Sequence, residues 1–286
     1  MRKQILTKYP NWINEIDGSK HVAGFTNDMD GLLCASFAKH YLGLEVNEFF
    51  DFETRYAINP DEERETIFFD CAVSQGKTFD NHVTKTFYSR LVNKKSANLN
   101  NVFEVGYDNY TGKFSMSTLI QLYSIFNIPL PKSEIGKMIL LCVDVGFKGF
   151  YNARFKSTYV NYLEIMGMAE LTDVLKKYTK EEMYQFMLSH QLNASIYRLK
   201  NKKLFIHMKD GYKIDWINFD TGMDLDFYTK HLGFKVFLPR GNFELVEEYE
   251  KRTMHQLEFT KKYKKMAFSY ALINAQTVMA SLKKGE

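Results

Sequence analysis

The stretch Phe25-Thr26-Asn27-Asp28-Met29-Asp30-Gly31 gives the clearest indication of the fold. A short apolar run at 22–25 precedes it and predicts a buried strand, and the apolar residues at 32–42 predict the helix that follows. Asp28 and Asp30 therefore lie where a strand turns into a helix. Ligands of open α/β sheets bind at the carboxyl ends of strands, so the sequence predicts a binding site at these two aspartates.

Three later aspartates follow other strand-like segments. Asp70 ends a β-prone run at 66–70, Asp80 follows residues 78–79, and Asp144 ends an apolar run at 138–144. The carboxyl ends of parallel strands lie at one sheet edge, so we expect these side chains to converge. Crowded carboxylates repel one another unless a cation neutralises them, and hard divalent cations prefer oxygen ligands. A single aspartate of this kind is also typical of a turn or a helix cap, so the repetition is what favours a site.

Strand-like and helix-like segments alternate along residues 1–169, which predicts an α/β domain with a mostly parallel sheet flanked by helices. The predicted strands lie at 22–25, 46–52, 66–70 and 138–144, and the predicted helices at 32–42, 83–92, 115–127 and 132–137. This arrangement would bring the acidic residues to one edge of the domain.

The second half of the chain is expected to form a smaller α+β domain at 191–286, joined by a helical connector at 170–190. Thr179 has the spacing of a capped helix start within the connector. Strands are predicted at 194–199, 203–208, 214–219 and 235–238. The stretch 243–284 contains no Pro or Gly, which predicts a long C-terminal helix. This helix would either pack across both domains or join two copies of the chain in a homodimer.

The order of the acidic motifs resembles that of the DHH phosphoesterase superfamily, which includes RecJ-type exonucleases, nano-RNases and class-II inorganic pyrophosphatases. The opening motif is most similar to the nano-RNase branch. The matching segments are Asn27-Asp28-Met29-Asp30-Gly31 with Cys34, then Phe69-Asp70, Asp80-Asn81-His82-Val83 and Cys142-Val143-Asp144-Val145-Gly146.

This resemblance implies a two-metal phosphoesterase that uses Mn²⁺ or Mg²⁺ to hydrolyse phosphodiester bonds of short oligonucleotides or small nucleotides. By position, Asp28 and Asp30 would each hold one metal, Asp70 would bridge the pair and Asp144 would complete the second site. His82 would face the substrate phosphate, and Asp28, Asp30 and His82 would be the catalytic residues.

Two features depart from the superfamily pattern and leave alternatives open. No His precedes the first aspartate pair closely, and Asn81 occupies the middle position of the Asp-His-His signature, where its amide oxygen would serve as the ligand. A catalytically degenerate nucleotide-binding protein is therefore one alternative. Asp28-Met29-Asp30-Gly31 also resembles the opening of haloacid-dehalogenase-type phosphatases, in which Asp28 would be the nucleophile and Asp30 the acid/base.

Charge and composition predict a cytoplasmic protein that does not enter membranes. The 286 residues carry a formal net charge of +4, and no apolar run approaches the length that spans a bilayer. The three cysteines, at 34, 71 and 142, lie in apolar segments and predict buried thiols in a reducing compartment. Three cations are predicted to contact substrate phosphates: Lys148, Arg154 and Arg240.

Overall fold

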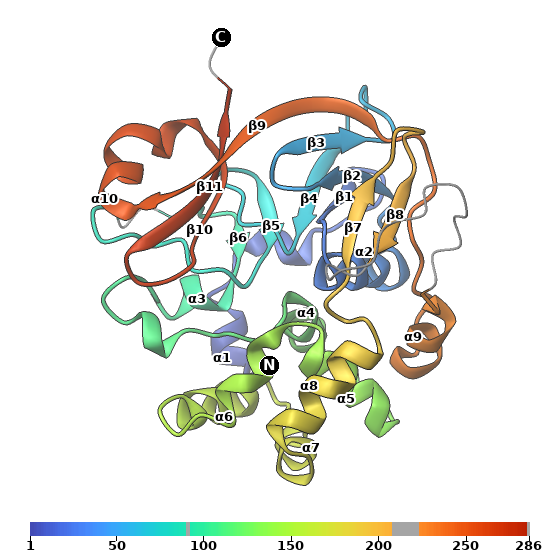
Figure 1. Ribbon diagram of the computed structural model, residues 1–286, viewed down its shortest axis with the longest axis vertical. Coiled ribbons are helices and arrows are strands. Elements are labelled where there is room, and N and C mark those ends of the chain that lie inside the picture. The colour runs from blue at the N-terminus through green and yellow to red at the C-terminus, as the bar shows by residue number, and fades with distance from the viewer. Residues whose placement is uncertain (90–91, 208–222, 285–286) are drawn as a thin grey trace.

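The computed structural model describes residues 1–89, 92–207 and 223–284. Its centre is a curled nine-stranded sheet in the order β10-β11-β9-β3-β2-β1-β4-β5-β6, with most of the helices gathered on one side (Figure 1). The chain is thus α/β, as predicted, although the sheet is mixed.

Five neighbouring strands form the parallel part of the sheet, and they place the candidate site. They are β2 (Val46–Phe50), β1 (His21–Thr26), β4 (Glu65–Phe69), β5 (Lys77–Phe79) and β6 (Ser96–Ala97). All six residues of β1 are buried, which explains the apolar run in the sequence. From β1 the chain continues to β2 on one side and returns to β4 on the other, so a topological switch point lies beside β1.

The remaining four strands of this sheet pair in antiparallel fashion, so the prediction of a mostly parallel sheet is wrong. They are β3 (Thr54–Ala57), β9 (Glu244–His255), β11 (Thr277–Lys283) and β10 (Ala267–Leu272). The outer edge of β10 is bound by the segments that follow β4 and β5, since the amide of Tyr270 donates to the carbonyl of Ala72 and the amide of Leu272 donates to the carbonyl of Val83. The end of the curled sheet is thereby joined to its parallel part.

The predicted C-terminal helix at 243–284 is wrong, because most of this segment forms strands β9, β10 and β11. On β11, Val278, Ala280 and Leu282 are buried on alternate positions, a period of two that favours a strand. Absence of Pro and Gly permits a strand as readily as a helix. The homodimer contact predicted through that helix therefore loses its basis.

The helix after β1 is confirmed as α2 (Met29–Leu42), which packs against β1, β4 and α4 (Thr118–Ile125). It ends at Gly43, whose φ of +67° is the left-handed conformation that glycine tolerates best. The predicted helix at 115–127 is confirmed as α4, and Ser117 caps it through a bond from the amide of Ile120.

Two predictions in the first half are wrong. The apolar run at 138–144 belongs to α5 (Glu134–Cys142), which Ser133 caps and which packs among α4, α7 (Leu171–Lys177), α8 (Lys180–Ser189) and α9 (Leu225–Leu232). A helix surrounded by other helices is apolar on several faces, so its sequence resembles that of a buried strand. The helix predicted at 83–92 is not formed by residues 83–89, which are extended or turn.

Residues 170–190, predicted as a connector between two domains, contain α7 and α8, and Thr179 and Glu182 form the predicted capping box of α8. The strands predicted at 194–199 and 203–208 are confirmed as the hairpin β7 (Ser195–Arg198) and β8 (Leu204–His207). Residues 235–238 form no strand, and 214–219 lie outside the described residues. The other helices are α1 (Lys3–Leu6), α3 (Leu99–Val102), α6 (Lys156–Ile165) and α10 (Gln256–Glu258).

The hydrophobic core lies on both faces of the sheet. The larger cluster packs the helices against side chains such as Phe25, Phe49 and Phe69. A smaller aromatic cluster lies on the opposite face, where Phe50 and Tyr249 contact Phe268 under the curl. Among the helices of the described chain, none combines the length and apolar character needed to cross a membrane.

Candidate metal centre

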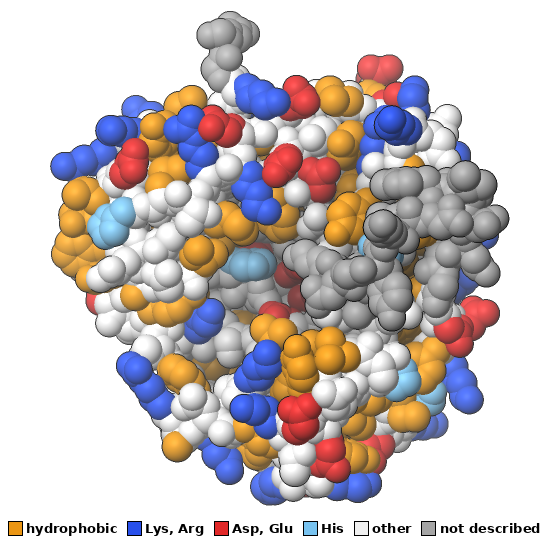
Figure 2. Space-filling model, in the orientation of Figure 1, with side chains coloured by type: hydrophobic (Ala, Val, Ile, Leu, Met, Phe, Trp, Pro, Cys, Tyr) orange, Lys and Arg blue, Asp and Glu red, His pale blue; other side chains and the backbone are white. Residues whose placement is uncertain are grey.

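A cavity of about 220 Å³ lies at the carboxyl ends of the parallel strands, beside the switch point. It appears in Figure 2 as a hollow in the middle of the face, with histidine and acidic side chains inside. Six residues predicted as site residues line it together: Asp28, Asp30, Asp70, Asn81, His82 and Asp144. Residues 192–195, which lead into β7, line its other side.

Asp28 and Asp30 are positioned by the first turn of α2. Asp28 is the N-cap, and its Oδ1 accepts a bond of 2.9 Å from the amide of Gly31. Asp30 is buried and accepts bonds from the amides of Thr118 at 2.6 Å and Leu119 at 3.0 Å. These amides begin α4, where a helix N-terminus favours negative charge. Asp30 therefore joins two helices while lining the cavity.

Gly31 allows this turn to lie directly on β1. A Cβ at this position would be 2.6 Å from Oγ1, 2.7 Å from the carbonyl oxygen and 2.9 Å from the amide nitrogen of Thr26. Two of these three atoms belong to the backbone, which cannot rotate away. The glycine of the acidic motif is thus required by close helix–strand packing.

We expect Gly31→Ala to lower the free energy of unfolding by about 1–3 kcal/mol, because overpacking against backbone outweighs the higher helix propensity of alanine. Urea denaturation of the two proteins measures the difference. Gly112→Ala is the control, since a Cβ there has no atom within 4 Å. Equal stability of the Gly31→Ala variant and the parent would contradict the packing argument.

Asp70 follows β4 with a φ of +58°, a left-handed backbone that is uncommon outside glycine and that concentrates at functional sites. Its carboxylate accepts bonds from the hydroxyl of Thr26 at 3.1 Å and of Thr118 at 2.8 Å. Thr26 thus supplies a hydroxyl donor to Asp70 from the end of β1.

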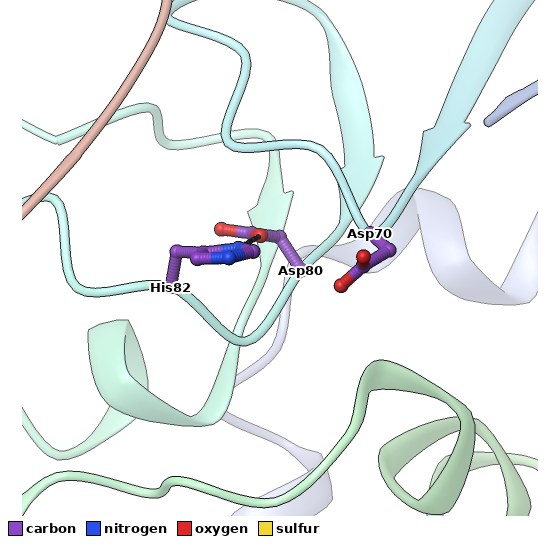
Figure 3. A group of neighbouring side chains, drawn as sticks. All are labelled: Asp70, Asp80 and His82. Carbon is purple, nitrogen blue, oxygen red and sulfur yellow. Dashed lines mark hydrogen bonds and ion pairs between the residues drawn. The ribbon is translucent and has the colours of Figure 1, made fainter. Parts of the chain in front are cut away.

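Asp80 and His82 follow β5 and form a pair beside Asp70 (Figure 3). Asp80 is fully buried, and its Oδ1 lies 2.6 Å from Nδ1 of His82, whose side chain is 40% exposed. One ligand atom from each of Asp70, Asp80 and His82 lies within 4.8 Å of the others, so this group can hold a metal ion. Two carboxylates and an imidazole suit divalent metals such as Mn²⁺ or Zn²⁺.

Buried amides brace the 80–82 turn, and sequence reasoning did not find them. Asn98 donates to Asp80 at 3.0 Å and to the carbonyl of His82 at 2.7 Å. Asn100 donates to the carbonyl of Asn81, and Gln121 to that of Asp80. Asn98 is also the N-cap of α3, and that local role is the only signal the sequence gives for any of them.

Burial and mutual repulsion make three carboxyl groups of the cavity hard to ionise, those of Asp30, Asp70 and Asp144. Burial, followed by the charges of Asp28 and Asp144, raises the pKa of Asp30 to about 7 against the two backbone bonds. Burial and then the charge of Asp30 raise the pKa of Asp70. Desolvation likewise raises the pKa of Asp144, although His82 opposes the shift. Desolvation lowers the pKa of His82, but the charge and hydrogen bond of Asp80 and the charges of Asp144 and Asp28 together outweigh it, and the value becomes about 9.

Two unpartnered amide oxygens complete the lining. Asn81 is 8% exposed and donates from Nδ2 to the carbonyl of Met116, but its buried Oδ1 has no partner among the described residues. The Oδ1 atom of Asn193 is also buried, and it too has no partner in the part of the chain that the structure describes. Buried polar atoms are normally satisfied, so each orphaned oxygen indicates a missing donor or cation. Such oxygens are suitable ligands for a hard cation, and the residues present fit one.

Asp144 enters the cavity from a different element than predicted, and the three predicted cations lie outside the cavity. Asp144 does line the cavity, but it follows α5 as the N-cap of the short helix η3 (Val145–Gly149), so its predicted place at a strand end is wrong. Lys148 lies over the ring of Tyr184, and Arg154 is exposed in a loop; neither lines the cavity. Arg240 lines a different cavity, between α2 and α9.

Comparisons of the chain with protein families, with curated proteins and with solved structures found no match in any of the three.

Proposed function

We propose that the protein is a metal-dependent phosphoesterase that hydrolyses phosphodiester bonds of short oligonucleotides or small nucleotides. The observation that carries this proposal is one cavity in which four carboxylates, an imidazole and an unpartnered amide oxygen meet at the switch point in the parallel part of the sheet. The ordered motifs of the DHH superfamily support the same chemistry.

In this proposal the group of Asp70, Asp80 and His82 holds one ion, and Asp28, Asp30 and Asp144 with the amide oxygen of Asn81 hold a second. Bound divalent ions would supply an acidified water and charge stabilisation for the phosphoryl oxygens. His82 would either bind the metal or contact the substrate phosphate. Asp80 orients the imidazole ring for both roles.

The chain's own residues also shape the site. Met187 and Leu192 form an apolar part of the wall, which excludes water from one side. Asp30 is held by two backbone amides and Asp80 by Asn98, so these carboxylates keep their positions without a ligand. A site already organised in this way binds and orients a substrate at little conformational cost.

The test is hydrolysis of RNA and DNA of two to five nucleotides by the purified protein. We expect mononucleotides to be released with Mn²⁺ or Mg²⁺ and no release after treatment with a chelator. If neither metal supports release from either nucleic acid, the phosphodiesterase proposal fails.

The amide at position 81 favours one other candidate, a protein of the same type that binds nucleotides without turnover. An amide oxygen is a weaker ligand for Mn²⁺ than an imidazole, so a weakened metal site could bind and not hydrolyse. Calorimetry distinguishes the two. Nucleotide binding without hydrolysis, whatever divalent metal is supplied, would select the binding protein.

A further inference from the structure

A pair of exposed aromatic rings lies on the chain just beyond the cavity. Phe87 is 56% exposed and Tyr88 49% exposed, and their ring centroids are 4.9 Å apart. Tyr107 extends the group, with its ring centroid 5.1 Å from that of Phe87. Large apolar side chains that are both exposed and adjacent mark binding surfaces more often than isolated ones do.

Hydrogen bonds hold the backbone under these rings. The amide of Phe87 donates to Oε1 of Gln256 at 2.7 Å, and Gln256 is itself 1% exposed and bound to the carbonyl of Ala275. The hydroxyls of Thr86 and Thr260 lie 3.2 Å apart. The rings are therefore presented to solvent from an anchored segment.

The anchoring partner is a lysine-rich helical segment at 260–265. Lys264 donates to the hydroxyl of Ser89 at 2.6 Å, and Lys261, Lys262 and Lys265 are exposed. The only acidic residue of 256–266 is Glu258, which lies 3.8 Å from Lys262 as an ion pair. Figure 2 shows hydrophobic and basic side chains, with a histidine and a few acidic side chains among them, along the margin of the face that carries α10 in Figure 1.

The number of residues between His82 and Phe87 limits the distance from the cavity to the aromatic rings. His82 lines the cavity, and Phe87 follows five residues later. Five extended residues span at most about 18 Å. A flexible strand of a few nucleotides with one end in the cavity can therefore reach the aromatic rings.

We propose that Phe87, Tyr88 and the lysines of 260–265 form a platform that binds the part of a single-stranded nucleic acid lying outside the cavity. Bases would stack on the rings, which accept any base, and phosphates would pair with the lysines. This inference rests on the proposed function for its substrate, and it adds a second binding surface that favours longer strands over dinucleotides.

The test measures binding of a fluorescent single-stranded octanucleotide in the presence of a chelator, so that no hydrolysis occurs. We expect the double substitution Phe87→Ala and Tyr88→Ala to raise Kd at least fivefold. Leu245→Ala should leave Kd unchanged, because Leu245 is also 56% exposed but lies on β9. Phe87→Trp should retain the affinity of the parent.

The lysines are tested by salt dependence. Lys261→Gln with Lys265→Gln should reduce the slope of log Kd against log salt by about 1.4, the value for two phosphate contacts on a single strand. Hydrolysis of a dinucleotide should be the same in all these variants and the parent.

The outcomes separate this inference from the proposed function. Octanucleotide binding that depends on Phe87 and Tyr88, in a protein that never hydrolyses, would support the platform and remove the phosphoesterase. Equal binding by the parent and the double variant, or no binding by the parent, would overturn the platform. The exposed rings would then be assigned to contact with a protein partner.

Discussion

Asp28→Asn is expected to reduce metal-dependent hydrolysis at least about a hundredfold while leaving the protein folded. Asn is as good an N-cap as Asp, so the bond from the amide of Gly31 is kept. The substitution removes one negative charge from the cavity and replaces one carboxylate oxygen by an amide group. The loss of activity would therefore report on the ion and not on α2.

The matched control is Asp224→Asn. Asp224 is the N-cap of α9, accepts a bond of 3.0 Å from the amide of Phe227, and is exposed away from the cavity. It should keep full activity and remain folded. Equal activity of the Asp28→Asn variant and the parent would contradict the metal role. A phosphoryl group trapped on Asp28 would instead select the haloacid-dehalogenase mechanism.

The metal-free protein is expected to lose stability as the pH rises from 5 to 8. The pKa of Asp30 is about 7 in the folded chain and about 4 in the unfolded chain, so the folded state binds more protons in this range. Stability then falls with rising pH, by roughly 3 kcal/mol for Asp30 alone. The raised pKa values of Asp70 and His82 act in the same direction.

Thermal unfolding in a chelator should show this as a fall in Tm of roughly 5–10 °C between pH 5 and pH 8. Mn²⁺ should reverse the fall at pH 8, because it binds the ionised cluster, and should have less effect at pH 5, where protons compete for the same groups. The Asp28→Asn variant should gain less from Mn²⁺. A Tm that rises with pH in the chelator would contradict the raised pKa values of the buried carboxyl groups. A Tm that Mn²⁺ does not change at pH 8 would contradict metal binding by these groups.

Sequence patterns predicted the elements that lie close together along the chain. The strand at 22–25, the helix at 32–42 and the turn between them are found as β1, α2 and the Asp28 cap. Here the apolar pattern, the cap residue and the glycine all favour the same local structure. Asp70 follows β4, which pairs in parallel with β1, and Asp80 follows β5, which pairs in parallel with β4, as the repeated motif predicted.

The same reasoning failed where packing partners decide the structure. The run ending at Asp144 is apolar because α5 is surrounded by helices, and its strand-like composition misled the prediction. Residues after 243 contain no helix breaker, yet β9 pairs with β3 from the first hundred residues. Neither local propensity nor spacing reveals a partner almost two hundred residues away.

The sequence by itself determined where the turn between β1 and α2 lies, because this follows from short-range periodicity and capping, and it indicated the carboxylates and the imidazole that line the cavity. Only the tertiary structure decided that Asp144 enters the same cavity from the end of a helix and that Asn98 and Gln121 brace the turn of His82. It also decided the pKa of Asp30, because desolvation and repulsion depend on burial and on the distance between groups remote in the chain.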